Sequence, residues 1–285
     1  MPQTIKGNSL LISFRRSLCA ALCVLFALAT ASPVAAQPSD YIVVYGDART
    51  QHDIHRKIVG HILTFRPQAV FSTGDQVNDG RTPDEWVIFN EIILPIRKTS
   101  EFYPLLGNHE RNADLYFKNF QLPVSERWYS VRKGPVLFLM LDSNWLIGPG
   151  SNQHAWLEKQ LQNVPRDVRF VAAVFHHPVI SSGPYPDEKN LRKRLLPLLE
   201  QYRVDVVFVG HEHVYERSLK DGITHVTTGG GGAPLHLKLR HNPYGQTFAS
   251  VHHFCVLRTA GQTLEVRVYD TELALIDEFR LKSRR

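Results

Sequence analysis

The sequence predicts an α/β fold in which two β-sheets carry helices on their outer faces. Up to residue 209, short apolar runs alternate with segments of helical spacing. From residue 224 onward, strand-like runs follow one another without a helix between them. The composition, with 43% hydrophobic and 21% charged residues in a chain of 285, is typical of a globular protein.

The first strands and helices follow from local patterns. Tyr41–Tyr45 and Ala69–Ser72 are short apolar runs, each followed by Gly-Asp, and are expected as buried strands. His52–Phe65 has apolar residues at helical spacing, and a second helix is expected to start at Pro83. Helices are also expected at His154–Leu161 and from about Asp187. Further strands are expected at Phe102–Leu106, Trp128–Val131, Val136–Leu141, Val168–Phe175, Val206–Val209, Thr224–Thr228, Ala249–Arg258, Leu264–Tyr269 and Leu273–Leu281.

Residues 1–36 are expected to be a secretory signal peptide rather than part of the fold. Arg15 and Arg16 precede an apolar run from Ser17 to Thr30, and Val34-Ala35-Ala36 matches a signal peptidase site. The protein is therefore expected to be exported, either periplasmic or secreted, with no stable membrane anchor after cleavage. One domain is expected over residues 39–285.

The charge of the chain argues against nucleic-acid binding, and its cysteine content argues against a disulfide-bonded domain. Lys6, Arg15 and Arg16 supply three of the net +6 charges and residues 1–36 contain no acid, so +3 remains for the domain. With no dense run of Lys and Arg, nucleic-acid binding is not expected. Cys255 is the only cysteine after residue 36, which excludes an intrachain disulfide in the domain.

Five predicted strands end in polar signatures that can bind metal ions. The signatures are Gly46-Asp47, Gly74-Asp75, Gly107-Asn108-His109-Glu110, His176-His177-Pro178 and Gly210-His211-Glu212-His213. Ligands of open α/β sheets lie beyond the carboxyl ends of strands, so these side chains should converge. Carboxylate, amide and imidazole ligands suit Fe, Mn or Zn, and their number suits two ions that share one carboxylate.

The order of these motifs resembles the calcineurin-like metallophosphoesterases. His213-Val214-Tyr215-Glu216-Arg217 and Thr227-Thr228 followed by four glycines are similar to the purple acid phosphatase branch. The resemblance runs from Tyr41 to Asp277. It implies an αββα sandwich of two mixed β-sheets flanked by helices, and hydrolysis of phosphate esters at a dinuclear metal centre by a metal-bound hydroxide.

The resemblance also implies a role for each motif residue. Asp75 would bridge the two ions, and His109 would be catalytic, contacting the scissile phosphate. The first ion would also be bound by Asp47 and His213. The second ion would also be bound by Asn108, His176 and His211.

Two positions depart from the family pattern. Most metallophosphoesterases have a histidine where Arg49 stands, and purple acid phosphatases have a tyrosine where Asn78 stands. The first ion therefore lacks one expected ligand, which argues against a tyrosinate–iron centre. We expect His55 to complete its shell, directly or through water, because the helix from His52 starts beyond a strand end. His52 and Asn78 are the other candidates. Arg49 is expected to contact either a substrate phosphate or a surface acid.

The sequence thus favours an exported metal-dependent phosphatase that acts on a small phosphate monoester. A phosphodiesterase, for example of cyclic nucleotides, is the alternative on the same site. A catalytically silent binding module of the same fold is the second alternative. The sequence leaves the oligomeric state open.

Overall fold

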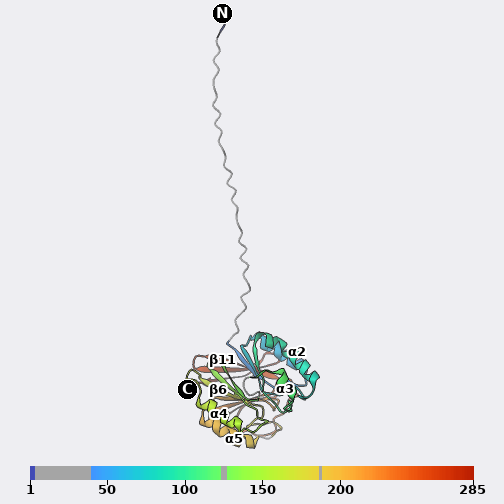
Figure 1. The fold of residues 1–285 in the computed structure, drawn as a ribbon, viewed down its shortest axis with the longest axis vertical. Coiled ribbons are helices and arrows are strands. Elements are labelled where there is room, and N and C mark those ends of the chain that lie inside the picture. The colour runs from blue at the N-terminus through green and yellow to red at the C-terminus, as the bar shows by residue number, and fades with distance from the viewer. Residues whose placement is uncertain (4–39, 123–126, 186–187) are drawn as a thin grey trace. The chain divides into compact units, whose positions relative to one another are not determined.

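Two β-sheets lie face to face at the centre of the unit Pro38–Arg285 (Figure 1). The computed structural model describes residues 1–3, 40–122, 127–185 and 188–285. The expected signal peptide lies outside these residues apart from its first three. In the part of the chain that is described, no helix has the length and apolar character needed to cross a membrane.

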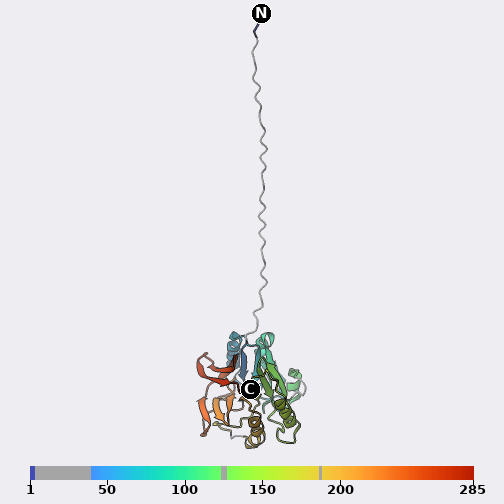
Figure 2. The same cartoon turned by 90° about the vertical axis from the view of Figure 1, so that its left-hand side faces the viewer.

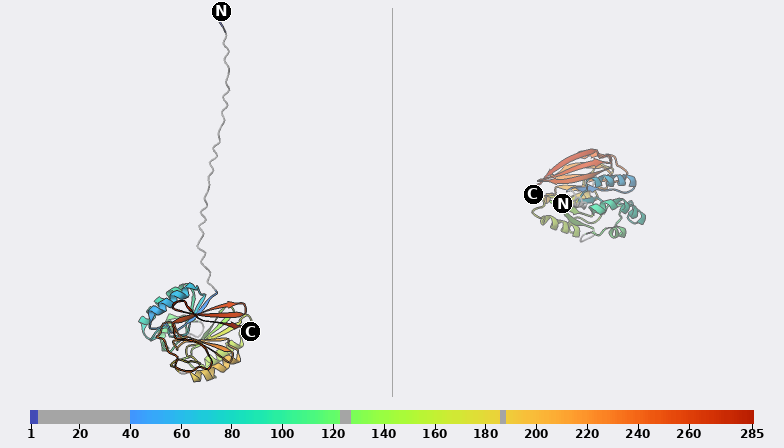
Figure 3. Two further views of the ribbon diagram at one scale, coloured as in Figure 1. Left: turned by 180° about the vertical axis from the view of Figure 1, so that it is seen from behind. Right: turned by 90° about the horizontal axis from the view of Figure 1, so that it is seen from above.

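The first sheet has six strands in the order β13-β12-β11-β1-β2-β3. Its parallel part comprises β1 (Ile42–Tyr45), β2 (Ala69–Ser72) and β3 (Glu101–Tyr103), with Ile42 beside Ala69 and Ala69 beside Glu101. The antiparallel part comprises β11 (His253–Ala260), β12 (Thr263–Asp270) and β13 (Leu275–Lys282). Strand β11 pairs with β1, so the last strands of the chain lie beside the first (Figure 3).

The second sheet has seven strands in the order β10-β8-β9-β7-β6-β5-β4. Its four parallel strands are β5 (Val136–Met140), β6 (Phe170–Val174), β7 (Val206–Val209) and β9 (Ile223–Thr228). The antiparallel strands are β4 (Tyr129–Lys133), β8 (Tyr215–Lys220) and β10 (Gly245–Ala249). Both sheets are therefore mixed.

Helices cover the outer face of each sheet. Helices α1 (His52–Thr64) and α2 (Pro83–Thr99) bury apolar side chains against β1, β2 and β11, and α3 (Asp114–Asn119) packs on α2. Helices α4 (Asn152–Gln162) and α5 (Lys189–Gln201) cover β5, β6 and β7. Figures 1 and 2 show the blue to teal helices on one side and the yellow-green to yellow helices on the other.

A continuous hydrophobic core fills the space between the sheets. Inward residues of both sheets belong to one cluster, and the rings of Phe71 and Phe138 stack across the interface with centroids 4.0 Å apart. Cys255 is buried in this cluster as a free thiol. The predicted αββα sandwich of two mixed sheets flanked by helices is confirmed.

Some elements differ from the sequence prediction. Strand β3 ends at Tyr103 rather than at Leu106, and α3, β8 and β10 were not predicted. Strand β8 carries Glu216, whose burial depends on hydrogen bonds and not on apolar packing: its carboxylate accepts from Ser182 and Asn242. Such a strand has no apolar alternation to reveal it.

Candidate metal centre

The signature residues meet where the carboxyl ends of β1 and β2 approach those of β6 and β7. Asp47, Asp75 and His211 each adopt a positive φ, of 56°, 54° and 69°. Residues outside glycine rarely adopt this conformation, and it persists where surrounding structure enforces it, often at functional sites. Here the enforcement is direct, because the Asp47 N–H donates to the Gly74 carbonyl at 2.9 Å and the His211 N–H donates to the Asp47 carboxylate.

The loops after β2 and β3 are held together by Glu110, which is fully buried. Its Oε2 accepts from the N–H groups of Gly107 at 2.6 Å and Asp75 at 3.0 Å, and its Oε1 accepts from that of Gln76 at 2.8 Å. Burial raises the pKa of Glu110 to about 8, with the charge of Asp75 as a further cause. The Asp75 carboxylate in turn lies so close to Gly107 that a Cβ there would come within 2.1 Å of Oδ1.

One group of converging ligand atoms comprises Asp47, Asp75 and His213, all within 4.8 Å of one another. His213 Nδ1 donates to the Pro234 carbonyl at 2.6 Å, so in neutral His213 the Nε2 lone pair faces the Asp47 oxygen, 3.4 Å away. Burial and the neighbouring Asp47 raise the pKa of Asp75 to about 6. The pKa of Asp47 is lowered to about 2, since burial is outweighed by the His213 hydrogen bond and nearby imidazoles.

The second group is centred on the side-chain oxygen of Asn108. This oxygen lies 2.9 Å from His176 Nε2 and 2.9 Å from His211 Nδ1. His176 Nδ1 donates to the Thr73 carbonyl at 2.8 Å, so neutral His176 directs the Nε2 lone pair at the Asn108 oxygen and at Asp75 Oδ1, 3.4 Å away. Lone pairs that converge in this way require a cation between them, so the residues fit a bound metal ion.

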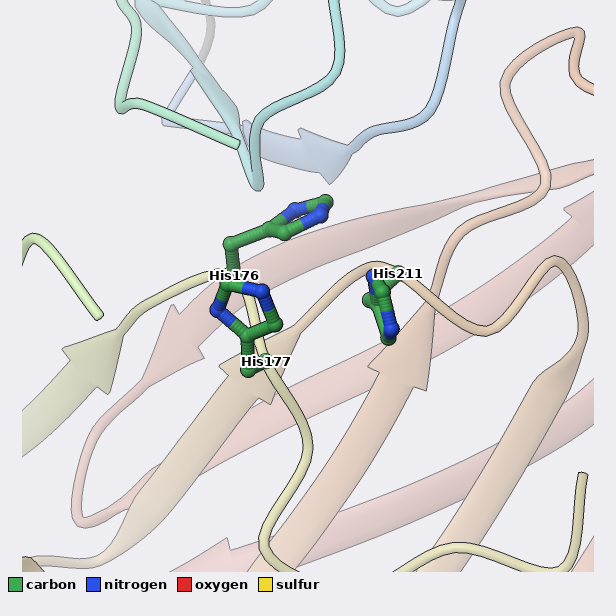
Figure 4. A group of neighbouring side chains, drawn as sticks. All are labelled: His176, His177 and His211. Carbon is green, nitrogen blue, oxygen red and sulfur yellow. The ribbon is translucent and has the colours of Figure 1, made fainter. Parts of the chain in front are cut away.

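His177 joins His176 and His211 in a cluster of three imidazoles (Figure 4). Its Nδ1 lies 2.8 Å from Ser143 Oγ, and its ring centroid lies 4.8 Å from that of His211. Burial lowers the pKa of all three histidines, to about 4 for His177 and about 2 for His211. The neutral imidazole is the form that binds metal ions. The position of His177 beside two candidate ligands was not predicted from the sequence.

His109 stands at the mouth of this arrangement. Its Nδ1 donates to the Asn78 carbonyl at 2.6 Å, which turns Nε2 toward Asp75 Oδ2 at 3.8 Å. Its side chain keeps 24% of its accessible surface, so a solute can reach it. Its backbone N–H donates to Asp75 Oδ1 at 3.0 Å, which couples its position to that of the shared carboxylate.

Arg49 reaches into the first group instead of a surface acid. Its Nε lies 3.5 Å from Asp75 Oδ2, and one terminal nitrogen lies 3.4 Å from His213 Nε2. The other terminal nitrogen donates to the Asn78 side-chain oxygen at 3.3 Å. The two positions that depart from the family pattern are therefore bonded to each other beside the candidate ligands.

His55 is placed differently from the prediction. It is 1% exposed, its Nε2 lies 3.0 Å from the Tyr45 hydroxyl, and its ring stacks on Phe89 at a centroid distance of 5.7 Å. The buried face of α1 comprises His55, Ile58, Val59 and Ile62, so His55 belongs to the apolar face of the helix. Neither ligand group among the described residues includes His55.

The loop that carries Tyr185 lies beside the three imidazoles and was missed by the sequence analysis. The Tyr185 ring is 4.7 Å from that of His211 and remains 47% exposed. Glu212 holds this loop, because its Oε1 accepts from Ser181 Oγ and from the Tyr185 N–H, while Oε2 bonds His236. The alternation of His211, Glu212 and His213 was the available signal, since the middle residue must point away from the metal ligands.

Comparison with known proteins assigns this arrangement to a family. The family model for calcineurin-like phosphoesterases matches residues 41–215, which is more than half of the chain. The chain therefore belongs to the calcineurin-like phosphoesterase family, as its motifs predicted. Among curated proteins it is similar to purple acid phosphatase 23 of Arabidopsis thaliana, with 30% identity over 171 residues, 52% of this chain and 37% of that protein.

A second curated relative is also a purple acid phosphatase, and two solved structures share the fold. Purple acid phosphatase 13 of Arabidopsis thaliana is 34% identical over 173 residues, 52% of this chain and 32% of that protein. The chain thus matches only about a third of the length of these relatives. Among solved structures, purple acid phosphatase PPD1 from yellow lupin has a TM-score of 0.78 at 21% identity, covering 85% of this chain and 53% of that one. GAP50 of Plasmodium, described as the anchor in the inner membrane complex, has a TM-score of 0.70 at 18% identity. The match covers 86% of this chain and 89% of that one.

Proposed function

We propose that this protein is an exported, metal-dependent phosphoesterase that hydrolyses small phosphate monoesters. The observation that carries the proposal is the pair of adjacent ligand groups that meet at Asp75, one with Asp47 and His213 and the other with Asn108, His176 and His211. Fe, Mn and Zn suit these oxygen and imidazole ligands. Ions of this kind, when bound, supply an activated water and neutralise phosphoryl charge.

The chain's own residues supply position and proton transfer. The Asp75 carboxylate accepts a hydrogen bond from the His109 N–H, and the Asp75 N–H donates to Glu110. These bonds fix both signature loops relative to the ligand groups. His109 Nε2 points into the same space while Nδ1 is bonded to a carbonyl, so Nε2 is the atom that would exchange a proton with the ester oxygen. General acids of this kind contribute about 10²–10⁴-fold to a rate.

The preference for a monoester rests on similarity to the purple acid phosphatases. A phosphodiesterase on the same site and a silent binding module are the alternatives that the experiment must separate. Export rests on the sequence of residues 1–36, and N-terminal sequencing of exported protein that begins near Gln37 would support it. An intact Met1 would contradict it.

The test is hydrolysis of p-nitrophenyl phosphate and bis(p-nitrophenyl) phosphate by metal-free protein reconstituted with Mn, Fe, Zn or Mg. We expect metal-dependent turnover that is faster on the monoester and is lost in Asp75→Asn. Faster turnover of the diester would replace phosphatase by phosphodiesterase. Metal binding without hydrolysis of either ester would favour the binding module.

A further inference from the structure

The group formed by Asp47, Asp75 and His213 already contains a cation that belongs to the chain. The Arg49 guanidinium lies 3.5 Å from the Asp75 carboxylate and 3.4 Å from the His213 Nε2 lone pair. A guanidinium stays protonated in proteins, so this positive charge is permanent. It stands beside the same atoms that an ion in this group would need.

The contacts of Arg49 indicate that its guanidinium occupies the position of an ion and does not form a close structural ion pair. All of its contacts in this group are at 3.3 Å or longer, and none has the bidentate geometry that arginine forms with a carboxylate. Arg49 Nε is buried with no hydrogen-bond partner among the described residues. The side chain as a whole is 14% exposed. An interior arginine with such long contacts is held by electrostatic attraction to the ligand groups around it.

The two groups therefore differ in their capacity for an ion. The Asn108 group offers an amide oxygen, two neutral imidazoles and the Asp75 carboxylate, with no cationic side chain among these contacts. The Asp47 group offers three ligands and faces Arg49. A metal ion sits about 2.0–2.2 Å from its nitrogen and oxygen ligands, so an ion bound to His213 Nε2 would lie within a few ångströms of the guanidinium. Like charges at that separation repel strongly.

We propose that the Arg49 guanidinium takes the place of an ion in the Asp47–Asp75–His213 group. The resting protein then holds one tightly bound ion, in the Asn108–His176–His211 group. A second ion enters only when Arg49 swings away. This inference rests on the metal binding within the proposed function and not on phosphatase activity.

The test is the metal stoichiometry of the purified chain, measured by titrating metal-free protein with Mn²⁺. Calorimetry gives the affinities, and electron paramagnetic resonance separates single Mn²⁺ ions from exchange-coupled pairs. We expect the unaltered protein to bind one ion tightly, with an uncoupled signal. Arg49→Ala should strengthen binding of the second ion by at least about tenfold and give a coupled signal, because a like charge near the site is removed.

Two further variants sharpen the result. Arg49→His restores the histidine of the family pattern and should bind two ions, and it serves as the second test if Arg49→Ala does not fold. Arg56→Ala removes an exposed arginine of α1 that pairs with Asp53, and it should match the unaltered protein. Two equally tight ions in the unaltered protein would overturn the proposal. A second-site affinity that changes less than twofold in Arg49→Ala, with a gain only in Arg49→His, would also overturn it, since the missing ligand would then be the cause.

Hydrolysis of the two p-nitrophenyl esters, measured on the same samples, keeps the two proposals apart. Stoichiometry as expected without hydrolysis would refute the enzymatic function and leave the role of Arg49 standing. Hydrolysis with two tight ions in the unaltered protein would do the reverse.

Discussion

Acidification should destabilise this fold through a histidine remote from the metal centre. His225 lies on β9 and is 5% exposed, and its Nδ1 has no hydrogen-bond partner among the described residues. Burial lowers its pKa to about 4, and the charges of Lys220 and Arg192 add to the effect. In the unfolded chain the pKa of a histidine is about 6.5. On acidification, His225 therefore takes up a proton at a higher pH in the unfolded chain than in the folded protein.

The sign and size follow from proton linkage. A group whose pKa is depressed on folding contributes stability above its unfolded pKa and loses it as the pH falls toward the folded value. For His225 this window runs from about pH 6.5 to about pH 4. Between pH 7 and pH 5 the loss is about 2 kcal/mol, since each pKa unit corresponds to about 1.36 kcal/mol.

Other groups also titrate in this range, so the assay compares variants at each pH. The free energy of unfolding of metal-free protein is measured in urea at pH 7 and pH 5, for the unaltered chain and for His225→Leu. The difference between the two proteins should shift by about 2 kcal/mol in favour of the variant at pH 5. His241→Leu, at an exposed position, is the control and should show no shift. A His225→Leu difference that stays constant within about 0.5 kcal/mol would refute the linkage argument.

The remaining predictions concern the metal centre. Asp75→Asn should lose the metal that the unaltered protein binds, because both ligand groups include this carboxylate, and retained stoichiometry in a metal analysis would contradict the shared role. His109→Ala should keep its metal and lower turnover about 10²–10⁴-fold, and loss of metal would show that His109 is a ligand instead. Glu110→Ala leaves four buried backbone N–H groups without their acceptor and should lower the free energy of unfolding in urea by about 3–5 kcal/mol. Glu91→Ala, exposed on α2, is its control, and an equal effect of the two would discount the bonds of Glu110.

The sequence predicted the elements whose burial is apolar. Strands β1, β2, β6 and β7 are buried at every residue, so they read as uninterrupted apolar runs. Strand β8 escaped prediction because Glu216 reaches the interior by bonding Ser182 and Asn242, which lie 34 and 26 residues away in the chain. Such compensation depends on tertiary contacts and leaves no local pattern.

The ligand groups were predictable for a different reason. Each ligand lies in a segment that follows a strand, and the sheet order brings those strand ends together whatever the side chains do. The residues Asp47, Asp75, Asn108, His176, His211 and His213 therefore converge as expected from order alone. That they bind metal ions stays a prediction until ions are counted.

Residues on helices and residues with long side chains were harder to predict. The orientation of the helix, or the conformation of the side chain, decides where their polar atoms lie. His55 was expected at the metal centre, but it belongs to the buried face of α1 and packs in the core against Phe89. At position 49 the sequence shows only that a family histidine is missing, which reads as a vacancy beside the first ion. A guanidinium at the end of a three-carbon chain is long enough to reach that position, and it contacts Asp75 and His213 there. A missing ligand therefore cannot be equated with an empty site when the residue in its place brings a positive charge of its own.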